Sequence, residues 1–113
     1  MAGMRCEVSE DARQDIALQY AWYFREAGKG IAERYLDAFR GTVDLIGRQS
    51  GVGVQRRFRN PRLKGIRSFQ LSAPFRVHLV FYREESDGLV VFRVLHGMKD
   101  LPKRLMQPPG AED

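Results

Sequence analysis

The first half of the chain alternates apolar and polar residues with the period of a helix. Ser9 is a candidate helix N-cap, and two acidic residues follow it in the first turn, where the helix dipole favours negative charge. Apolar residues then recur at steps of three and four, which places them on one helix face. They are Ala12, Ile16, Tyr20, Tyr23 and Ala27. Gly28 is expected to end the helix in a left-handed conformation.

A second helix is predicted from about Ile31 to Ile46, after a tight turn at Gly28-Lys29-Gly30. Its apolar stripe consists of Ala32, Tyr35, Leu36, Phe39, Val43 and Ile46. Two helices joined by so short a turn must be antiparallel neighbours. The pattern therefore predicts a helical hairpin.

A period of two, typical of strands, marks the remaining apolar segments. The predicted strands are Met4–Val8, Ile66–Ala73, Phe75–Arg83 and Leu89–Leu95. The segment Phe75–Arg83 is apolar on both faces, which favours the middle of a sheet. Asp87-Gly88 is a hairpin turn signal, and strands with such short links are antiparallel.

The elements combine into a β-α-α-β-β-β order of the α+β class, with the helical hairpin on one face of a small antiparallel sheet. Gly47–Pro61 is expected to be a loop because its glycines break any period. Asp100, followed by Pro102, is the expected N-cap of a short C-terminal helix. We expect a single domain over residues 1–107 and a disordered tail over residues 108–113.

Length and composition narrow the class of protein. With 113 residues the chain holds one modest core, and it has no apolar run near the roughly 20 residues that span a bilayer. The start of the chain lacks the layout of a signal peptide, and Cys6 is the only cysteine, so no internal disulfide forms. A cytoplasmic protein without membrane contact is therefore expected. Two scattered histidines and one cysteine make no zinc pattern, and no cofactor motif is present.

Positive charge is concentrated in the middle of the chain. The net charge is +5, and residues 45–83 contain nine bases and no acid. Seven of these bases fall within twenty residues: Arg48, Arg56, Arg57, Arg59, Arg62, Lys64 and Arg67. A solvated loop is one interpretation. The other is an anionic partner, either nucleic acid or an acidic protein segment.

Two arginines interrupt strands that are otherwise apolar. Arg76 and Arg93 must each reach solvent, a bound anion or a carboxylate, because burying an unpaired guanidinium is expensive. The candidate internal carboxylates are Glu7, Asp37 and Asp44.

The two histidines give only a weak sign of catalysis. His78, in the middle of a strand, is interpreted as structural. For His96 a turn-stabilising hydrogen bond and a functional role both remain open.

Three blocks of sequence resemble the ParE branch of the RelE/ParE toxin superfamily. They are Leu63–Phe69, Phe75–Arg83 and Arg93–Pro102, the last of which reads Arg-Val-Leu-His-Gly-Met-Lys-Asp-Leu-Pro. The resemblance runs from about Cys6 to Leu105. It implies a helical hairpin on an antiparallel sheet, the same fold that the patterning predicts.

The resemblance implies the toxin of a bacterial type II toxin–antitoxin pair, which uses no cofactor. Its partner would resemble ParD, a small DNA-binding antitoxin that wraps the toxin, so the toxin would meet operator DNA only through the antitoxin. ParE-like toxins inhibit DNA gyrase, and toxicity is associated with the C-terminal part of the family. The implied target-binding residues are Met98, Lys99, Leu101, Lys103, Arg104 and Leu105.

A RelE-like ribosome-dependent endoribonuclease is the alternative function. Arg76 and Lys99 match two of its basic groups, but Leu105 stands where a tyrosine is expected, and Phe69 or Gln70 where a lysine is expected. A binding module of the same fold without toxicity is a third possibility.

Antitoxin binding is expected to use aromatic and basic side chains. The candidates are Trp22, Phe24, Arg56, Arg57, Arg59, Arg67 and Arg76. Burial of Trp22 and Phe24 in the protein's own core is the competing interpretation.

Overall fold

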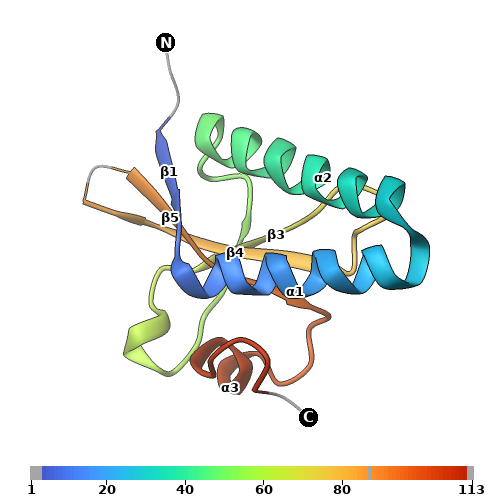
Figure 1. The fold of residues 1–113 in the computed structure, drawn as a ribbon. Helices are drawn as coiled ribbons and strands as arrows, with labels where there is room; N and C mark the ends of the chain where they lie inside the picture. Colours follow the sequence, from blue (N-terminus) through green and yellow to red (C-terminus); the bar gives the residue numbers. More distant parts are fainter. Residues whose placement is uncertain (1–3, 87, 112–113) are drawn as a thin grey trace.

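The computed structural model describes residues 4–86 and 88–111. Figure 1 shows a sheet with a pair of long helices on one side and a short helix on the other. The elements are β1 (Arg5–Val8), α1 (Glu10–Ala27), α2 (Lys29–Arg48), β2 (Val54–Gln55), the 3-10 helix η1 (Pro61–Leu63), β3 (Arg67–Gln70), β4 (His78–Glu85), β5 (Gly88–His96) and α3 (Leu101–Met106). The predicted α+β order is confirmed, with β2 as an additional short strand within the expected loop.

The sheet is mixed, which corrects the expectation of a purely antiparallel one. Its strands lie in the order β1-β5-β4-β3-β2, so β4 is the middle strand as predicted. The pairs β2–β3, β3–β4 and β4–β5 are antiparallel, whereas β1 runs parallel to β5, with Arg5 opposite Gly88. No short link joins β1 to β5, so the rule for hairpin strands does not apply to this pair.

The helical hairpin forms as the pattern predicts, with a tighter connection. Ser9 is the N-cap of α1, and its side chain accepts a hydrogen bond from the Ala12 N–H. Gly28 alone joins the helices, so α2 begins at Lys29 rather than near Ile31. Its φ of 91° and ψ of 170° are not the left-handed helical conformation that the sequence predicted. They lie in an extended region with positive φ that only glycine adopts without strain. This conformation lets the chain reverse within one residue.

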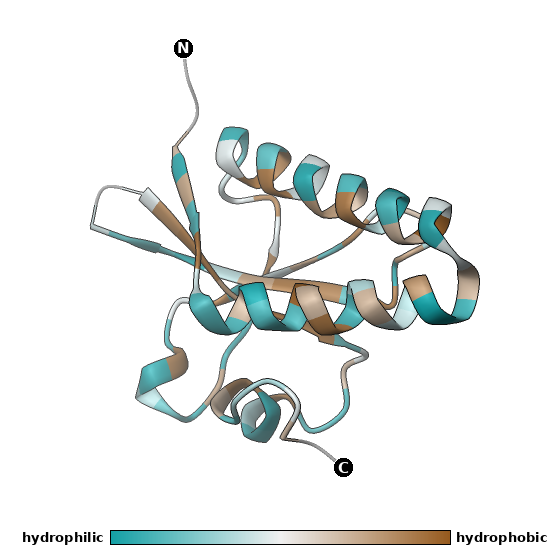
Figure 2. Cartoon of the chain, viewed as in Figure 1, coloured by the Kyte–Doolittle hydropathy of each residue, from teal (hydrophilic) through white to brown (hydrophobic). Residues whose placement is uncertain are grey.

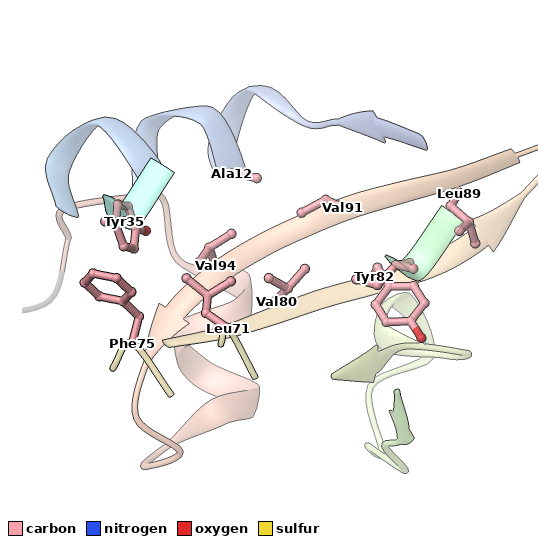
Figure 3. Packing of buried hydrophobic residues seen from close by; sticks show 10 residues of the cluster. Ala12, Tyr35, Leu71, Phe75, Val80, Tyr82, Leu89, Val91 and Val94 are labelled. Carbon is pink, nitrogen blue, oxygen red and sulfur yellow. The ribbon is translucent and has the colours of Figure 1, made fainter. Parts of the chain in front are cut away.

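The core has two parts, one on each face of the sheet. On the hairpin side, Figure 3 shows Val80, Val91 and Val94 of the central strands near Ala12 and Tyr35 of the helices. On the other side, Leu79 and Phe81 of β4 pack with residues of η1, α3 and the segments beside them. That second cluster is Leu63, Ile66, Leu79, Phe81, Leu95, Leu101 and Leu105. The alternation along β4 therefore buries both of its faces.

Hydropathy along the helices agrees with this layering. Figure 2 shows hydrophobic and hydrophilic turns alternating along both long helices, over a largely hydrophobic centre of the sheet. Amphipathic helices of this kind gain most of their stability by burying one face. The hairpin can therefore hold side chains of α1 and α2 in fixed places above the sheet.

The bounds of two predicted strands and one predicted helix cap also differ from the structure. β4 begins at His78 and not at Phe75, because residues 72–78 form turns that leave Val77 exposed. β3 is shorter than predicted and ends at Gln70. Asp100 precedes α3 but makes no capping hydrogen bond, since its left-handed backbone (φ 55°, ψ 40°) differs from the extended conformation of a capping residue. Asp87, the first residue of the predicted hairpin turn, lies outside the described residues.

The structure also bears on the C-terminal tail, on membrane-spanning helices and on metal sites. In the expected tail, the Ala111 N–H donates to the Pro108 carbonyl at 3.2 Å, and residues 112–113 lie outside the described residues. Within the described ranges, no helix has the length and apolar character needed to cross a bilayer. The same residues contain no group of three or more His, Cys, Asp or Glu side chains arranged to hold a metal ion.

Candidate functional site

A broad groove, which we call the basic groove, lies between α2 and the strands β2 and β3. It has a volume of about 730 Å³. Its aliphatic walls include Leu45, Val52, Val54, Leu71 and Leu79. The charged residues that line it are Arg56, Arg76 and Asp37. The groove thus combines apolar walls with an excess of positive charge.

The two arginines of the groove are held differently. The Arg56 Nε–H donates to the Ser68 hydroxyl at 2.7 Å, which fixes the guanidinium against β3. Arg76 is exposed in the turn before β4. It therefore reaches solvent, one of the outcomes that the sequence leaves open for it.

Part of the basic segment holds the chain's own backbone. Arg67 donates to the Gly53 carbonyl at 2.9 Å, and Arg83 donates to the Arg62 carbonyl at 2.6 Å. Arg57 and Arg59 are exposed. The positive charge is therefore divided between internal bonds to the loop and free surface side chains.

Arg93 lies in a buried network that joins three elements. Its guanidinium forms a bidentate ion pair with Asp15 of α1, at 2.7 Å (Nε–Oδ2) and 2.9 Å (Nη2–Oδ1). It also donates to the backbone carbonyls of Arg104 and Gln107, at the end of α3. The partner is thus neither Glu7, Asp37 nor Asp44. The sequence prediction missed Asp15, although it lies three residues after Ala12 on the buried face of α1.

The predicted target-binding residues fall into two groups. Met98, Lys99 and Lys103 are exposed, and Arg104 is partly buried. Arg104 donates to the carbonyls of His96 and Lys99, at 2.8 and 3.1 Å. Leu101 and Leu105 are 6% and 2% exposed, because they fill the core beneath α3. In this conformation the two leucines hold the helix, and the polar side chains form its surface.

The predicted aromatic anchors lie on different sides of α1, because residues two positions apart in a helix point in nearly opposite directions. Trp22 is 52% exposed and Phe24 is 50% exposed, so neither is buried in the protein's own core. Neither residue lines the basic groove. The structure therefore separates these aromatics from Arg56 and Arg76.

A second cavity, which we call the aromatic pocket, lies between α1, the end of β5 and α3. Its volume is about 420 Å³. Its lining residues include Asp15, Leu18, Gln19, Trp22, Tyr23, His78, His96 and Arg104. None of its lining residues is shared with the basic groove.

The histidines of the aromatic pocket differ in environment. His78 is 3% exposed, and its Nε2 lies 2.8 Å from the Tyr23 hydroxyl, consistent with a structural role. Burial, with a smaller effect of His96, lowers the pKa of His78 to about 4, so the ring is neutral at neutral pH. The exposed His96 ring stacks edge-on against His78, with 5.3 Å between ring centroids. No turn-stabilising bond from the His96 side chain occurs among the described residues; its carbonyl accepts a bond from Arg104 instead.

The groups expected of a nuclease are not gathered in one place. Arg76 lines the basic groove with Phe69 and Gln70, whereas Lys99 is not among the lining residues. Leu105 is buried. Of the described residues that line the groove, none is a histidine or tyrosine that could transfer a proton.

With this geometry established, comparison with known proteins identifies the family. Residues 6–101 match the family model described as the ParE toxin of the type II toxin–antitoxin system parDE. The chain belongs to the ParE toxin family. The match includes the hairpin, most of the sheet and the first residue of α3, so all lining residues of the basic groove lie within the family match of this ParE toxin, whereas Arg104 and Gly110 of the aromatic pocket lie beyond it.

Solved structures agree on the fold of this ParE toxin. It is similar to a chain of the structure titled "Chromosomal ParDE TA system from P. aeruginosa", with a TM-score of 0.69 and 17% sequence identity. The alignment covers 84% of this chain and 97% of the other. Among curated proteins, none matches the sequence.

Proposed function

We propose that this ParE toxin inhibits DNA gyrase by direct protein contact and that a ParD-like antitoxin neutralises it in a hetero-oligomeric complex. The observation that carries the proposal is the division of α3 into a buried apolar side and an exposed basic surface. Lys103 of α3 and Lys99 in the turn just before it are exposed, while Leu101 and Leu105 hold the helix to the sheet. A rigid support that presents exposed cations suits recognition of another macromolecule.

The proposed target-binding surface consists of Met98, Lys99, Lys103 and Arg104. Met98 is 56% exposed and offers a flexible apolar contact next to Lys99 in the sequence, at the edge where the target-binding surface meets the basic groove that Met98 also lines. Leu101 and Leu105 contribute by fixing α3, since their side chains have little surface left for a partner.

The basic groove is the proposed main antitoxin site. An amphipathic segment could place its apolar side chains against Val54 and Leu45 and its carboxylates near Arg56 and Arg76. The exposed Arg57 and Arg59 would extend the positive surface beyond the groove. Arg67 would act indirectly, because it holds the preceding loop through its bond to the Gly53 carbonyl. Phe24 is proposed as an anchor for a part of the antitoxin outside the groove. Contact with operator DNA would come through the antitoxin alone.

A non-enzymatic mechanism is supported by the composition of the basic groove. The nuclease alternative needs a proton donor or acceptor beside Arg76. The described lining residues offer only Asp37, a carboxylate exposed on α2 that pairs with Arg40 at 3.3 Å. We therefore do not propose the endoribonuclease as the function.

The test is inhibition of supercoiling by purified gyrase. The wild-type toxin is expected to inhibit the enzyme, and the double variant Lys99→Ala/Lys103→Ala to require roughly tenfold more toxin, a loss of about 1.4 kcal/mol of binding. Lys29→Ala, at the far end of the hairpin, is the matched control and should inhibit like the wild type. Full gyrase activity at a large excess of wild-type toxin would refute the proposal.

A further inference from the structure

The aromatic pocket shares no lining residue with the basic groove, and neither Lys99 nor Lys103 lines it. Most of its polar lining is satisfied internally, the exception among the described buried side chains being His78 Nδ1, which has no hydrogen-bond partner. Gln19 donates to the Val94 carbonyl at 2.8 Å and accepts from the Tyr35 hydroxyl, while Tyr23 bonds His78. Asp15, the carboxylate that lines the pocket, is paired with Arg93. An occupant therefore meets an interior with few free polar partners, which favours an apolar group.

The mouth of the pocket exposes large apolar side chains. Leu18 and Trp22 stand one helical turn apart on α1 and are 53% and 52% exposed. The Trp22 ring rests edge-on against Tyr23, with 5.2 Å between centroids, so it is supported from one side and open on the other. Aromatic side chains supported in this way are typical centres of protein interfaces.

The rim of the pocket carries positive charge. Both hydrogen bonds of Arg104 use its terminal nitrogens, which leaves its Nε–H without an acceptor among the described residues. Lys103, its exposed neighbour in the sequence on α3, adds to the positive electrostatic potential at the rim. Asp15 does not neutralise this charge, because it is already paired with Arg93. The group on a partner that complements Arg104 is therefore a carboxylate.

We infer that the aromatic pocket receives a bulky apolar side chain of the toxin's target, with a carboxylate of the same target segment bound at Arg104. This inference rests on the proposed function, because Arg104 belongs to both the pocket and the proposed target-binding surface. The antitoxin is the less favoured occupant, since the basic groove shares no lining residue with the pocket. The target surface would thus continue from α3 onto the part of α1 that carries Leu18 and Trp22.

The experiment compares Trp22→Ala and Leu18→Gln with Val77→Ala. Val77 is the control, because it is an exposed apolar residue that lines neither the aromatic pocket nor the basic groove. Each variant is measured for growth arrest when expressed in bacteria, for gyrase inhibition and for co-purification with the antitoxin. Thermal unfolding confirms that each variant folds.

The inference predicts that Trp22→Ala and Leu18→Gln abolish growth arrest and raise the toxin concentration for half inhibition of gyrase at least tenfold. Both should still co-purify with the antitoxin, and Val77→Ala should keep its growth arrest, its inhibition of gyrase and its antitoxin binding. The inference would be overturned if the folded pocket variants arrest growth and inhibit gyrase like the wild type. It would also be overturned if they lose antitoxin binding but keep both of these activities. If wild-type toxin arrests growth without inhibiting gyrase, the proposed function fails. In that case, if the pocket variants lose growth arrest and the control variant keeps it, the pocket is still supported as the site for a different target.

Discussion

Arg93 of β5 and Asp15 of α1 face each other in a bidentate ion pair, with side chains that are only 2% and 6% exposed. The same carboxylate accepts the Val94 N–H at 3.0 Å, and the same guanidinium donates to two carbonyls at the end of α3. A single charged pair thus connects the hairpin, the sheet and the helix that we propose contacts the target. Neither charge has much access to water, so each depends on the other.

Replacement of Asp15 by Ala should strongly destabilise the protein. The change leaves the Arg93 guanidinium buried without its counter-ion, which typically costs about 3–5 kcal/mol. The free energy of unfolding, measured by urea denaturation, checks this. Asp37→Ala is the control, because its pair with Arg40 is exposed and should contribute less than about 1 kcal/mol. A loss for Asp15→Ala as small as that of the control would contradict the role given to the pair.

Tyr82→Phe should destabilise the loop between α2 and β3. The buried hydroxyl accepts the Gly53 N–H and donates to the Ser50 carbonyl, both at 2.8 Å. Its removal leaves both backbone groups without this partner, at a cost of about 1–3 kcal/mol. Tyr20→Phe is the matched control, since its hydroxyl bonds Glu33 at the surface. Equal unfolding free energies for the two variants would show that the Tyr82 bonds add no stability.

His78 should make stability depend on pH. The pKa of His78 is about 4 in the folded protein, compared with 6.5 for an unperturbed histidine, so between these values the unfolded chain binds more protons. Stability is therefore complete above about pH 6.5 and falls as the pH is lowered towards 4. Between pH 7 and pH 5 the expected loss is about 2 kcal/mol.

The measurement is denaturant unfolding at pH 5, 6 and 7. His78→Gln removes the titrating ring and should flatten the dependence over this range. His96→Gln removes an exposed ring and the smaller cause of the shift, so most of the dependence should remain. A wild-type protein equally stable at pH 5 and pH 7 would show that His78 does not carry this linkage.

Arg76→Glu should weaken antitoxin binding. The change places negative charge in the basic groove, where we propose that an acidic segment binds, and should lower affinity roughly 10–100-fold at low salt. The difference should shrink as salt increases, because Arg76 is exposed and its charge is screened. Titration calorimetry with the antitoxin checks this, with Arg25→Glu on the outer part of α1 as the control. Equal affinity of the two variants would place the antitoxin elsewhere.

Much of the fold follows from local patterns. The Ser9 cap, the stripes of the two helices and the two-sided apolar character of β4 each reflect short-range rules, and the structure confirms them. The parallel pairing of β1 with β5 was not predictable in the same way. It joins residues more than eighty positions apart, and no turn signal specifies it.

The candidate site was predictable only in part. The exposure of Trp22 and Phe24 follows from their positions outside the apolar stripe of α1. Asp15 was missed because a single carboxylate within an apolar stripe looks like an irregularity, although the isolated Arg93 required such a partner. The aromatic pocket depends on where α3 packs against the sheet and α1, and nothing local in the sequence determines that arrangement.

Titration of a fixed amount of gyrase with increasing toxin tests the central claim most directly. Inhibition by contact predicts that supercoiling falls to its minimum near a stoichiometric ratio, does not progress with incubation time and returns when the antitoxin is added. Gyrase that stays fully active at every ratio, or inactivation that progresses with time at a small fraction of the stoichiometric amount, would contradict the account.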